Sequence, residues 1–250
     1  THWDAPPVCL TMPDDEAHVW RVTVDPPPQT PDAVQALTLE EQARVAAFQN
    51  ADRATQFTVV RTALRQILSL YAEAPSIMLR LMHDRMGRPA MAPGQPGDDL
   101  HFSVAHSKAI GLIAVTRAGP IGVDVEFMGA DRDFSAIARR FFLSTEAQIL
   151  SAMPADAQRI AFYRSWTIKE ACLKAMGWGL AEGLAAVETN PDPAAPPHTV
   201  RVRGANASVS WELAVLQPAR EYAAAAALQG PRVHWRGFTW NPDNPLFQAW

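Results

Sequence analysis

Two acidic side chains lie two positions apart in the segment Ile121–Glu126, whose sequence is Ile-Gly-Val-Asp-Val-Glu. If this segment is a strand, its side chains alternate between faces. Asp124 and Glu126 then share one face, with Cα atoms about 7 Å apart. Two carboxylates at this spacing repel each other unless a proton or a cation lies between them. Because carboxylate oxygens are hard ligands that suit Mg²⁺, the pattern indicates either a magnesium site or an exposed strand with two solvated acids.

A third acid lies in a predicted helix from Ala157 to Met176. Glu170 and Lys174 are four residues apart in this helix and therefore share a face. Lys169 is adjacent to Glu170 in the sequence. The chain has only three lysines among its 22 basic residues, and these are two of the three. The pattern indicates either a routine surface ion pair or a carboxylate for a metal with ammonium groups for phosphate oxygens.

Two further positions suit the recognition of phosphate groups. Gly87-Arg88-Pro89 is a turn-forming sequence that offers the guanidinium of Arg88 to an anion. His106 follows the predicted strand Leu100–Val104 and precedes a turn. A single histidine at such a place is either a hydrogen-bonded loop residue or a contact to a ligand.

These segments, taken in order along the chain, resemble the Sfp-type 4'-phosphopantetheinyl transferases. The resemblance covers about Thr38 to Val187, and the last two main motifs in this order are specific to the family. The main matches are Gly87-Arg88-Pro89, Ala105-His106-Ser107, Ile121–Glu126 and Trp166–Lys174, with further matches at Arg140–Phe142, Thr145-Glu146 and Gly177–Leu180.

The resemblance implies that Asp124, Glu126 and Glu170 hold Mg²⁺ against the pyrophosphate of coenzyme A, the substrate. It implies that Lys169 and Lys174 contact the phosphates, with Lys174 placed to stabilise the leaving group. Glu170 is the candidate base, acting directly or through a metal-bound water. The predicted catalytic residues are thus Glu170, Lys174 and Asp124.

At the nucleotide end of coenzyme A, the resemblance implies contacts from Arg88 and His106. The sequence departs from the family directly before the histidine, where Ala105 stands in place of a frequent serine. The effect of this alanine is left open by the sequence.

The second departure lies in an earlier predicted helix. The family often has an arginine there that touches the nucleotide phosphates, and the corresponding residue here is Gln56. Arg53 or Arg61 is the candidate replacement, and the sequence does not choose between them.

The implied activity is transfer of the 4'-phosphopantetheine group of coenzyme A to a serine hydroxyl of an apo acyl or peptidyl carrier protein. The reaction releases 3',5'-ADP and is of the holo-[acyl-carrier-protein] synthase type. The alternative is a Mg-dependent pyrophosphate hydrolase acting on coenzyme A or a related nucleotide. A third alternative is a binding module without activity, against which the intact acids and Lys174 argue. The type of carrier stays open.

The order of the predicted elements indicates an α+β fold. Strand, helices and strands follow one another twice, which predicts two α+β halves of similar build. The predicted halves are residues 1–118 and residues 119–250, and the second carries the metal-binding motifs. The resemblance implies that a pseudo-twofold axis relates the halves and that the active site lies in the cleft between them.

The individual elements follow from periodicity and from local stop signals. Thr38 and Glu41 form a predicted capping box at the start of a helix, and Gly177 is predicted to end the long helix. Residues 86–99 are predicted to form a loop. The predicted strands are His18–Val24, Leu100–Val104, Gly111–Thr116, Ile121–Phe127, Thr199–Arg203, Ser208–Leu216, Tyr222–Leu228 and Val233–Trp240. The predicted helices are Asp52–Tyr71, Phe134–Phe142, Thr145–Leu150 and Ala157–Met176.

Bulk properties exclude several classes of protein. The net charge is -4 and the pI is near 6.0, which argues against nucleic-acid binding. Neither a leader sequence nor an apolar run of membrane-spanning length is found, so we expect a cytoplasmic protein. The two cysteines, Cys9 and Cys172, are too distant in sequence to suggest a disulfide framework. The family resemblance suggests a monomer.

Overall fold

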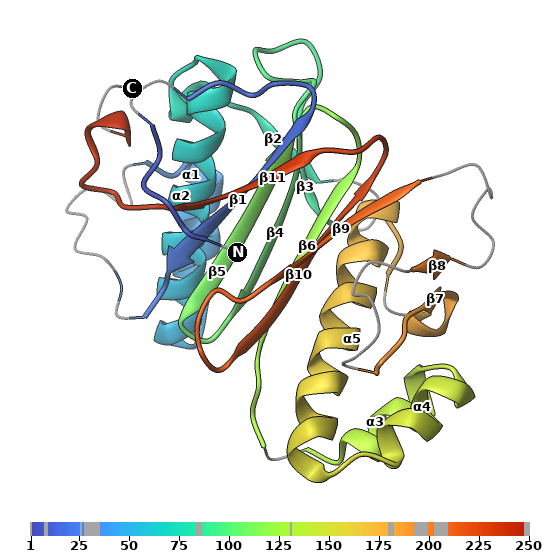
Figure 1. Cartoon of the computed structure of the whole chain (residues 1–250). Helices are drawn as coiled ribbons and strands as arrows, with labels where there is room; N and C mark the ends of the chain where they lie inside the picture. Colours follow the sequence, from blue (N-terminus) through green and yellow to red (C-terminus); the bar gives the residue numbers. More distant parts are fainter. Residues whose placement is uncertain are drawn as a thin grey trace.

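The structure analysed is a computed structural model that describes residues 2–7, 10–25, 27, 36–83, 87–130, 132–179, 183–192, 200–202 and 210–247. Two β-sheets lie at its centre, and one long helix packs on each (Figure 1). The predicted α+β class is confirmed. Leu180, Cys9 and the ends of the predicted strand Thr199–Arg203 lie outside the described residues.

The first sheet has the strand order β11-β1-β5-β4, and the second has the order β6-β10-β9. Two small hairpin sheets pair β2 with β3 and β7 with β8. The strands are β1 Glu16–Thr23, β2 Leu81–His83, β3 Pro89–Met91, β4 His101–Ser107, β5 Ile110–Thr116, β6 Ile121–Phe127, β7 Val187–Glu188, β8 Arg201–Val202, β9 Trp211–Leu216, β10 Tyr222–Gln229 and β11 His234–Thr239. The helices are α1 Leu39–Ala46, α2 Ala51–Ala72, α3 Phe134–Phe141, α4 Ser144–Ser151 and α5 Ala155–Met176, with short 3-10 turns at Ser76–Met78, Leu184–Ala186 and Pro245–Phe247.

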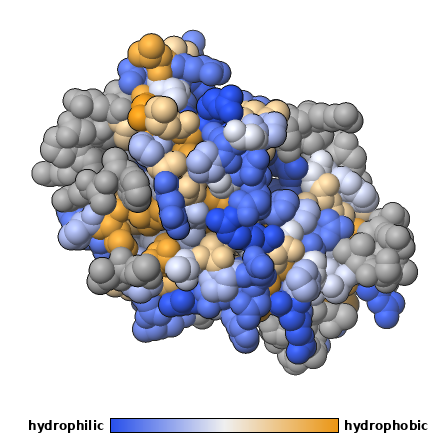
Figure 2. Space-filling model, turned by 90° about the horizontal axis from the view of Figure 1, so that it is seen from above, coloured by the Kyte–Doolittle hydropathy of each residue, from blue (hydrophilic) through white to orange (hydrophobic). Residues whose placement is uncertain are grey.

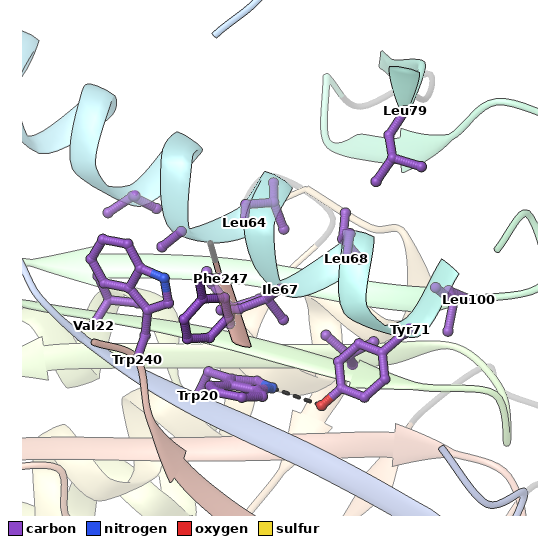
Figure 3. Packing of buried hydrophobic residues seen from close by; sticks show 14 of the residues in the cluster. Trp20, Val22, Leu64, Ile67, Leu68, Tyr71, Leu79, Leu100, Trp240 and Phe247 are labelled. Carbon is purple, nitrogen blue, oxygen red and sulfur yellow. Dashed lines mark hydrogen bonds between the residues drawn. The ribbon is translucent and has the colours of Figure 1, made fainter. Parts of the chain in front are cut away.

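The helix α2 packs on the first sheet through large apolar side chains. Leu64, Ile67 and Tyr71 of α2 lie in one buried cluster with Trp20 of β1 (Figure 3). Trp20 Nε1 donates a hydrogen bond of 2.9 Å to the Tyr71 hydroxyl, and the ring of Phe247 lies 5.9 Å from that of Trp20. Burial of each such side chain contributes about 1.5–3 kcal/mol, so this cluster fixes α2 on the sheet.

The helix α5 packs on the second sheet through much smaller side chains. The alanine-rich run Ala223–Ala227, part of the predicted strand Tyr222–Leu228, forms the centre of β10. Its alanines from Ala224 onward are almost fully buried. On β6, Gly122 allows a still closer approach. A β-carbon at that position would lie 1.9 Å from the Ala171 carbonyl oxygen and 2.7 Å from the Ala175 nitrogen. The absence of a side chain at Gly122 therefore sets the distance between α5 and β6.

The two sheets meet where β4 lies beside β6 (Figure 1). The Val123 N–H donates a hydrogen bond to Ser103 Oγ, and the Phe127 N–H donates one to Ser107 Oγ, each at 3.1 Å. Both bonds join residues 20 positions apart, which places the two strands in parallel. We call this boundary, formed by Ser103 and Ser107 with the β6 backbone, the hydroxyl seam.

The predicted helix signals are confirmed. The Thr38 side chain accepts from the Glu41 N–H while the Glu41 carboxylate accepts from the Thr38 N–H. Gly177 ends α5 in the left-handed conformation, with φ of 73°, which glycine adopts without steric cost.

Two predictions about elements need correction. The predicted loop at residues 86–99 contains the strand β3, which pairs with β2. The strand β11 was predicted within the second half, 119–250, but it pairs in parallel with β1 in the first sheet. Alternating side chains predict a strand without identifying its partner. The chain changes sheet between β5 and β6, near the predicted join, and the division into two domains stays a prediction.

The close approach at Gly122 yields the first testable prediction. We expect Gly122→Ala to lower the free energy of unfolding by about 3 kcal/mol, because the added methyl group meets helix backbone that cannot rotate away. Gly111→Ala is the matched control, since its β-carbon would meet side chains and no backbone: Val60 at 3.2 Å, and Val22 and Val24 at 3.5 Å. This control should stay within about 1 kcal/mol of the wild type in urea unfolding. Equal losses in the two variants would contradict the tight contact between α5 and β6.

Candidate active site

The strand β6 and the helix α5 bring one lysine onto one of the predicted acids. Lys174 Nζ lies 2.8 Å from Asp124 Oδ1 and 2.9 Å from the Val123 carbonyl oxygen. Asp124 is 6% exposed. The alternation predicted for β6 is therefore present, and the last turn of α5 lies directly beside it.

Glu170 and Glu126 lie within electrostatic reach of the same aspartate. Burial, followed by the charge of Asp124, raises the pKa of Glu170 to about 7, against the opposing effect of Lys174. Burial and then Asp124 also raise the pKa of Glu126, while a hydrogen bond from Ser107 lowers it. The pKa of Asp124 itself is raised by burial, in spite of Lys174. The three acids thus form a group whose negative charges are costly to hold together.

Two oxygens of this group are buried without a hydrogen-bond partner, Asp124 Oδ2 and Glu170 Oε1. Buried carboxylate oxygens without partners are costly, and a hard divalent cation would satisfy both. Within the ranges that the structure describes, no three acid, histidine or cysteine side chains already stand together as a metal-binding group. The types and the charges of Asp124, Glu126 and Glu170 therefore fit Mg²⁺, whereas their arrangement does not form a finished site.

Arg88, directly before β3, contacts the end of α5. Its Nη1 donates a hydrogen bond to the Lys174 carbonyl oxygen, and its guanidinium lies against Gly177 at the end of α5. Together with Lys174, His101 and Ser103 it lines a cavity of about 190 Å³. Seen from above, the surface shows a band of hydrophilic side chains across its middle (Figure 2). The structure thus brings Arg88 to the same helix turn as Lys174.

His106 lines a second hollow, of about 150 Å³, which is almost wholly apolar. Desolvation and then the nearby Lys174 ammonium lower the pKa of His106, which favours its neutral form. Arg61 lines the same hollow, is 9% exposed and stacks over the ring of Phe57, with Cζ 5.3 Å from the ring centroid. Arg53 lies on the exposed first turn of α2. Arg53 and Arg61 are the candidates for the nucleotide contact that the family makes with an arginine at the position of Gln56. Arg61 lines the same hollow as His106, and Arg53 does not.

The structure corrects the prediction that Lys169 contacts phosphates. Its side chain is fully buried, and Nζ lies 2.8 Å from Glu146 Oε2 and donates to the carbonyl oxygens of Leu184 and Val187. Glu146 in turn accepts hydrogen bonds from the N–H and hydroxyl of Thr189. Successive helical residues point about 100° apart, so Lys169 faces the core while Glu170 faces β6.

Two residues that affect the hydrogen bonding and the pKa of Glu126 were not predicted from the sequence. The Ser107 hydroxyl lies 3.1 Å from Glu126 Oε2, and the positive charge of Arg132 also lowers the pKa of Glu126. Ser107 was part of a matched motif, but its position on β4 gives no sign of a contact to β6. The spacing of Ser103 and Ser107, which places both on one face of β4, is the signal that was available.

Comparison with known proteins identifies the family of this chain. Residues 120–227 match the sequence model of the 4'-phosphopantetheinyl transferase superfamily. The 4'-phosphopantetheinyl transferase HetI of Nostoc sp. (strain PCC 7120) is 32% identical over 241 residues, which cover 96% of each chain. The 4'-phosphopantetheinyl transferase Sfp of Bacillus subtilis is 29% identical over 57% of this chain and 61% of its own. The human L-aminoadipate-semialdehyde dehydrogenase-phosphopantetheinyl transferase is 25% identical over 64% of this chain and 55% of its own.

The chain belongs to the 4'-phosphopantetheinyl transferase superfamily. Among the described residues, no helix has the length and apolar character that crossing a membrane requires.

The buried ion pair of Lys169 yields a prediction about stability. We expect Lys169→Met to lower the free energy of unfolding by about 3–5 kcal/mol, because it leaves the Glu146 carboxylate buried without its cation. Lys108→Met, at an exposed lysine, should change it by less than about 1 kcal/mol. Urea unfolding measures both. An unchanged stability of Lys169→Met would show that this lysine is not an anchor of the core.

The crowded acids yield a prediction about pH in the presence of a chelator. The pKa of Glu170 in the folded protein, about 7, lies above its ordinary value of 4.5. The folded state therefore loses stability from this group as the pH rises from about 4.5 to about 7. We expect Glu170→Gln to become more stable than the wild type by about 1–2 kcal/mol at about pH 8, a figure reduced for partial exposure. A stability difference between the two proteins that is the same at about pH 5 and about pH 8 would contradict this account.

Proposed function

We propose that this chain transfers the 4'-phosphopantetheine group of coenzyme A to a serine hydroxyl of an apo carrier protein, releasing 3',5'-ADP. Membership of the superfamily carries the reaction class. The observation that supports the location is the convergence of Lys174, Asp124 and Glu170 where α5 meets β6. The comparisons give no support to the alternative, a pyrophosphate hydrolase.

We propose Mg²⁺ as the cofactor, held by Asp124, Glu126 and Glu170. When bound, it withdraws charge from the pyrophosphate and favours in-line attack at phosphorus. The unpartnered oxygens of Asp124 and Glu170 support this ligand set, as do the burial and then the repulsion that raise the pKa values of Glu126 and Glu170.

Lys174 and Glu170 have the properties that the transfer step needs. Lys174 Nζ lies within the acid group and is partly exposed, so its charge can offset the negative charge that develops on the bridging oxygen of the leaving 3',5'-ADP. Glu170 has a buried carboxylate oxygen that lacks a hydrogen-bond partner. This oxygen can accept the proton of the attacking serine hydroxyl.

We propose that Arg88, His106 and Arg61 bind the nucleotide end of coenzyme A. Arg88 lines the cavity next to Lys174, and the other two line the apolar hollow. A guanidinium suits phosphate oxygens, and an apolar hollow suits a base. Lys169 has no part in this proposal, because its ammonium is buried on another side of α5.

The finer assignments are proposals that rest on the family resemblance. We propose acyl or peptidyl carriers as the acceptors, as for a holo-[acyl-carrier-protein] synthase type enzyme. We further propose that the chain acts as a cytoplasmic monomer, without a nucleic-acid or membrane partner.

The activity can be tested by mass spectrometry of the carrier. We expect acyl or peptidyl apo carriers, mixed with the protein, coenzyme A and Mg²⁺, to gain the mass of one phosphopantetheine group. Glu170→Ala should remove this gain while leaving the fold intact, because it deletes a proposed metal ligand and base. Glu40→Ala, at an exposed acid of α1, is the control and should retain activity.

Each result has a distinct meaning. If no type of carrier gains mass with the wild-type protein, the proposed reaction is wrong. If coenzyme A is cleaved without a carrier, the hydrolase alternative is correct. Normal turnover by Glu170→Ala would remove this residue from the active site.

A further inference from the structure

The hydroxyl seam has a regular structure along β6. Val123 and Phe127 donate their N–H groups to Ser103 and Ser107. With the same offset of 20 positions, the residue of β4 that corresponds to Val125 is Ala105, which has no hydroxyl. The Val125 N–H interacts instead with the carboxylate of Asp124 and lowers its pKa. The alanine that departs from the family pattern therefore lies at the one position of the seam where the N–H serves an acid of the active site.

Ser107 makes one hydrogen bond more than Ser103. A serine hydroxyl has one proton to donate and lone pairs that accept. Ser107 Oγ accepts from the Phe127 N–H and donates to Glu126 Oε2, both at 3.1 Å. Ser103 Oγ accepts from Val123, and among the described residues it bonds to no carboxylate. The two serines thus form a matched pair that differs in one contact.

The strand end that carries Ser107 is held by neighbouring residues. Two residues further along the chain, the Ala109 N–H donates a hydrogen bond to the hydroxyl of Tyr222 at 3.2 Å. The ammonium of Lys108 lies 3.9 Å from the centroid of the Phe127 ring, and that ring packs against Tyr222. The Ser107 hydroxyl is therefore fixed with respect to β6 and can fix the carboxylate that it contacts.

Ser107 holds the Glu126 carboxylate by a hydrogen bond, whereas the charges of Arg132 and Lys174 act on it without one. Among the described residues, the bond from Ser107 is the one side-chain hydrogen bond to this carboxylate.

We propose that Ser107 is a positioning residue: its hydroxyl holds the Glu126 carboxylate in the orientation in which it binds the divalent cation. The proposal rests on the proposed function. Partners that orient a metal ligand typically contribute a factor of 10–100 to metal affinity. The same hydroxyl also satisfies the β6 backbone, so one side chain couples the boundary between the sheets to the acid group.

The test uses Mn²⁺ alone as the probe, without coenzyme A, because Ser103 lines the cavity proposed for that substrate. Electron paramagnetic resonance counts the free Mn²⁺. We expect Ser107→Ala to raise the dissociation constant for Mn²⁺ about tenfold. Ser103→Ala loses the same type of backbone hydrogen bond and should stay within about twofold of the wild type. The two variants should lower the urea midpoint by similar amounts. At saturating Mg²⁺, the turnover number of Ser107→Ala should approach that of the wild type, because Ser107 does not touch the reacting atoms.

A second pair of variants applies if Ser107→Ala does not fold. Ser107→Thr keeps the hydroxyl and Ser107→Val has the same shape without it, so only the valine variant should lose Mn²⁺ affinity. Equal Mn²⁺ affinity in Ser107→Ala and Ser103→Ala, or in the threonine and valine variants, would overturn the proposal. A wild-type protein that modifies carriers while these pairs do not differ refutes the role of Ser107 alone. A wild-type protein that modifies no carrier refutes the proposed function.

Discussion

The contact between the α5 backbone and β6 at Gly122 is the constraint on which the active site depends. The Ala171 carbonyl oxygen lies where a side chain at this position would begin. This approach places Glu170 and Lys174 of the helix next to Asp124 and Glu126 of the strand. Any residue larger than glycine would move the helix away and separate the two pairs. The geometry of the site is thus a consequence of packing between the layers.

The site also concentrates unfavourable electrostatics in one place. Three carboxylates share one ammonium group, and two of their oxygens lack partners. Such an arrangement costs stability, and the apolar packing around α5 offsets that cost. In the buried apolar cluster around α5, the rings of Phe162 and Phe142 stack with their planes 9° apart. The ion pair of Lys169 with Glu146 further joins α5 to α4. The fold therefore carries a local electrostatic cost that a divalent cation would relieve.

The boundary between the two sheets is part of the site as well. The strand β11 returns to the first sheet beside β1, so the chain crosses the boundary twice. The seam formed by Ser103 and Ser107 joins β4 to β6 through side chains. Arg88 joins the region of β3 to the last turn of α5. A side chain of the first sheet, Ser107, thus contacts an acid of the second.

Sequence periodicity predicted those parts of the site that depend on one element alone. The alternation of β6 placed Asp124 and Glu126 on a common face, and the capping box at Thr38 began α1 as expected. The approach of Glu170 to β6 followed only from the family resemblance, since no local pattern states which strand a helix face will meet. Lys169 was misplaced because adjacency in sequence differs from adjacency on a helix. The contact from Ser107 and the partner of β11 were missed because both depend on tertiary structure.

We propose that Asp124, Glu126 and Glu170 bind one divalent cation beside the pyrophosphate of coenzyme A. The decisive measurement is a crystal structure of the protein with coenzyme A and Mn²⁺, recorded with anomalous scattering from the metal. We expect one anomalous peak bonded to oxygens of all three acids, with Lys174 at the phosphates. A peak away from these acids, with the pyrophosphate bound elsewhere, would contradict it.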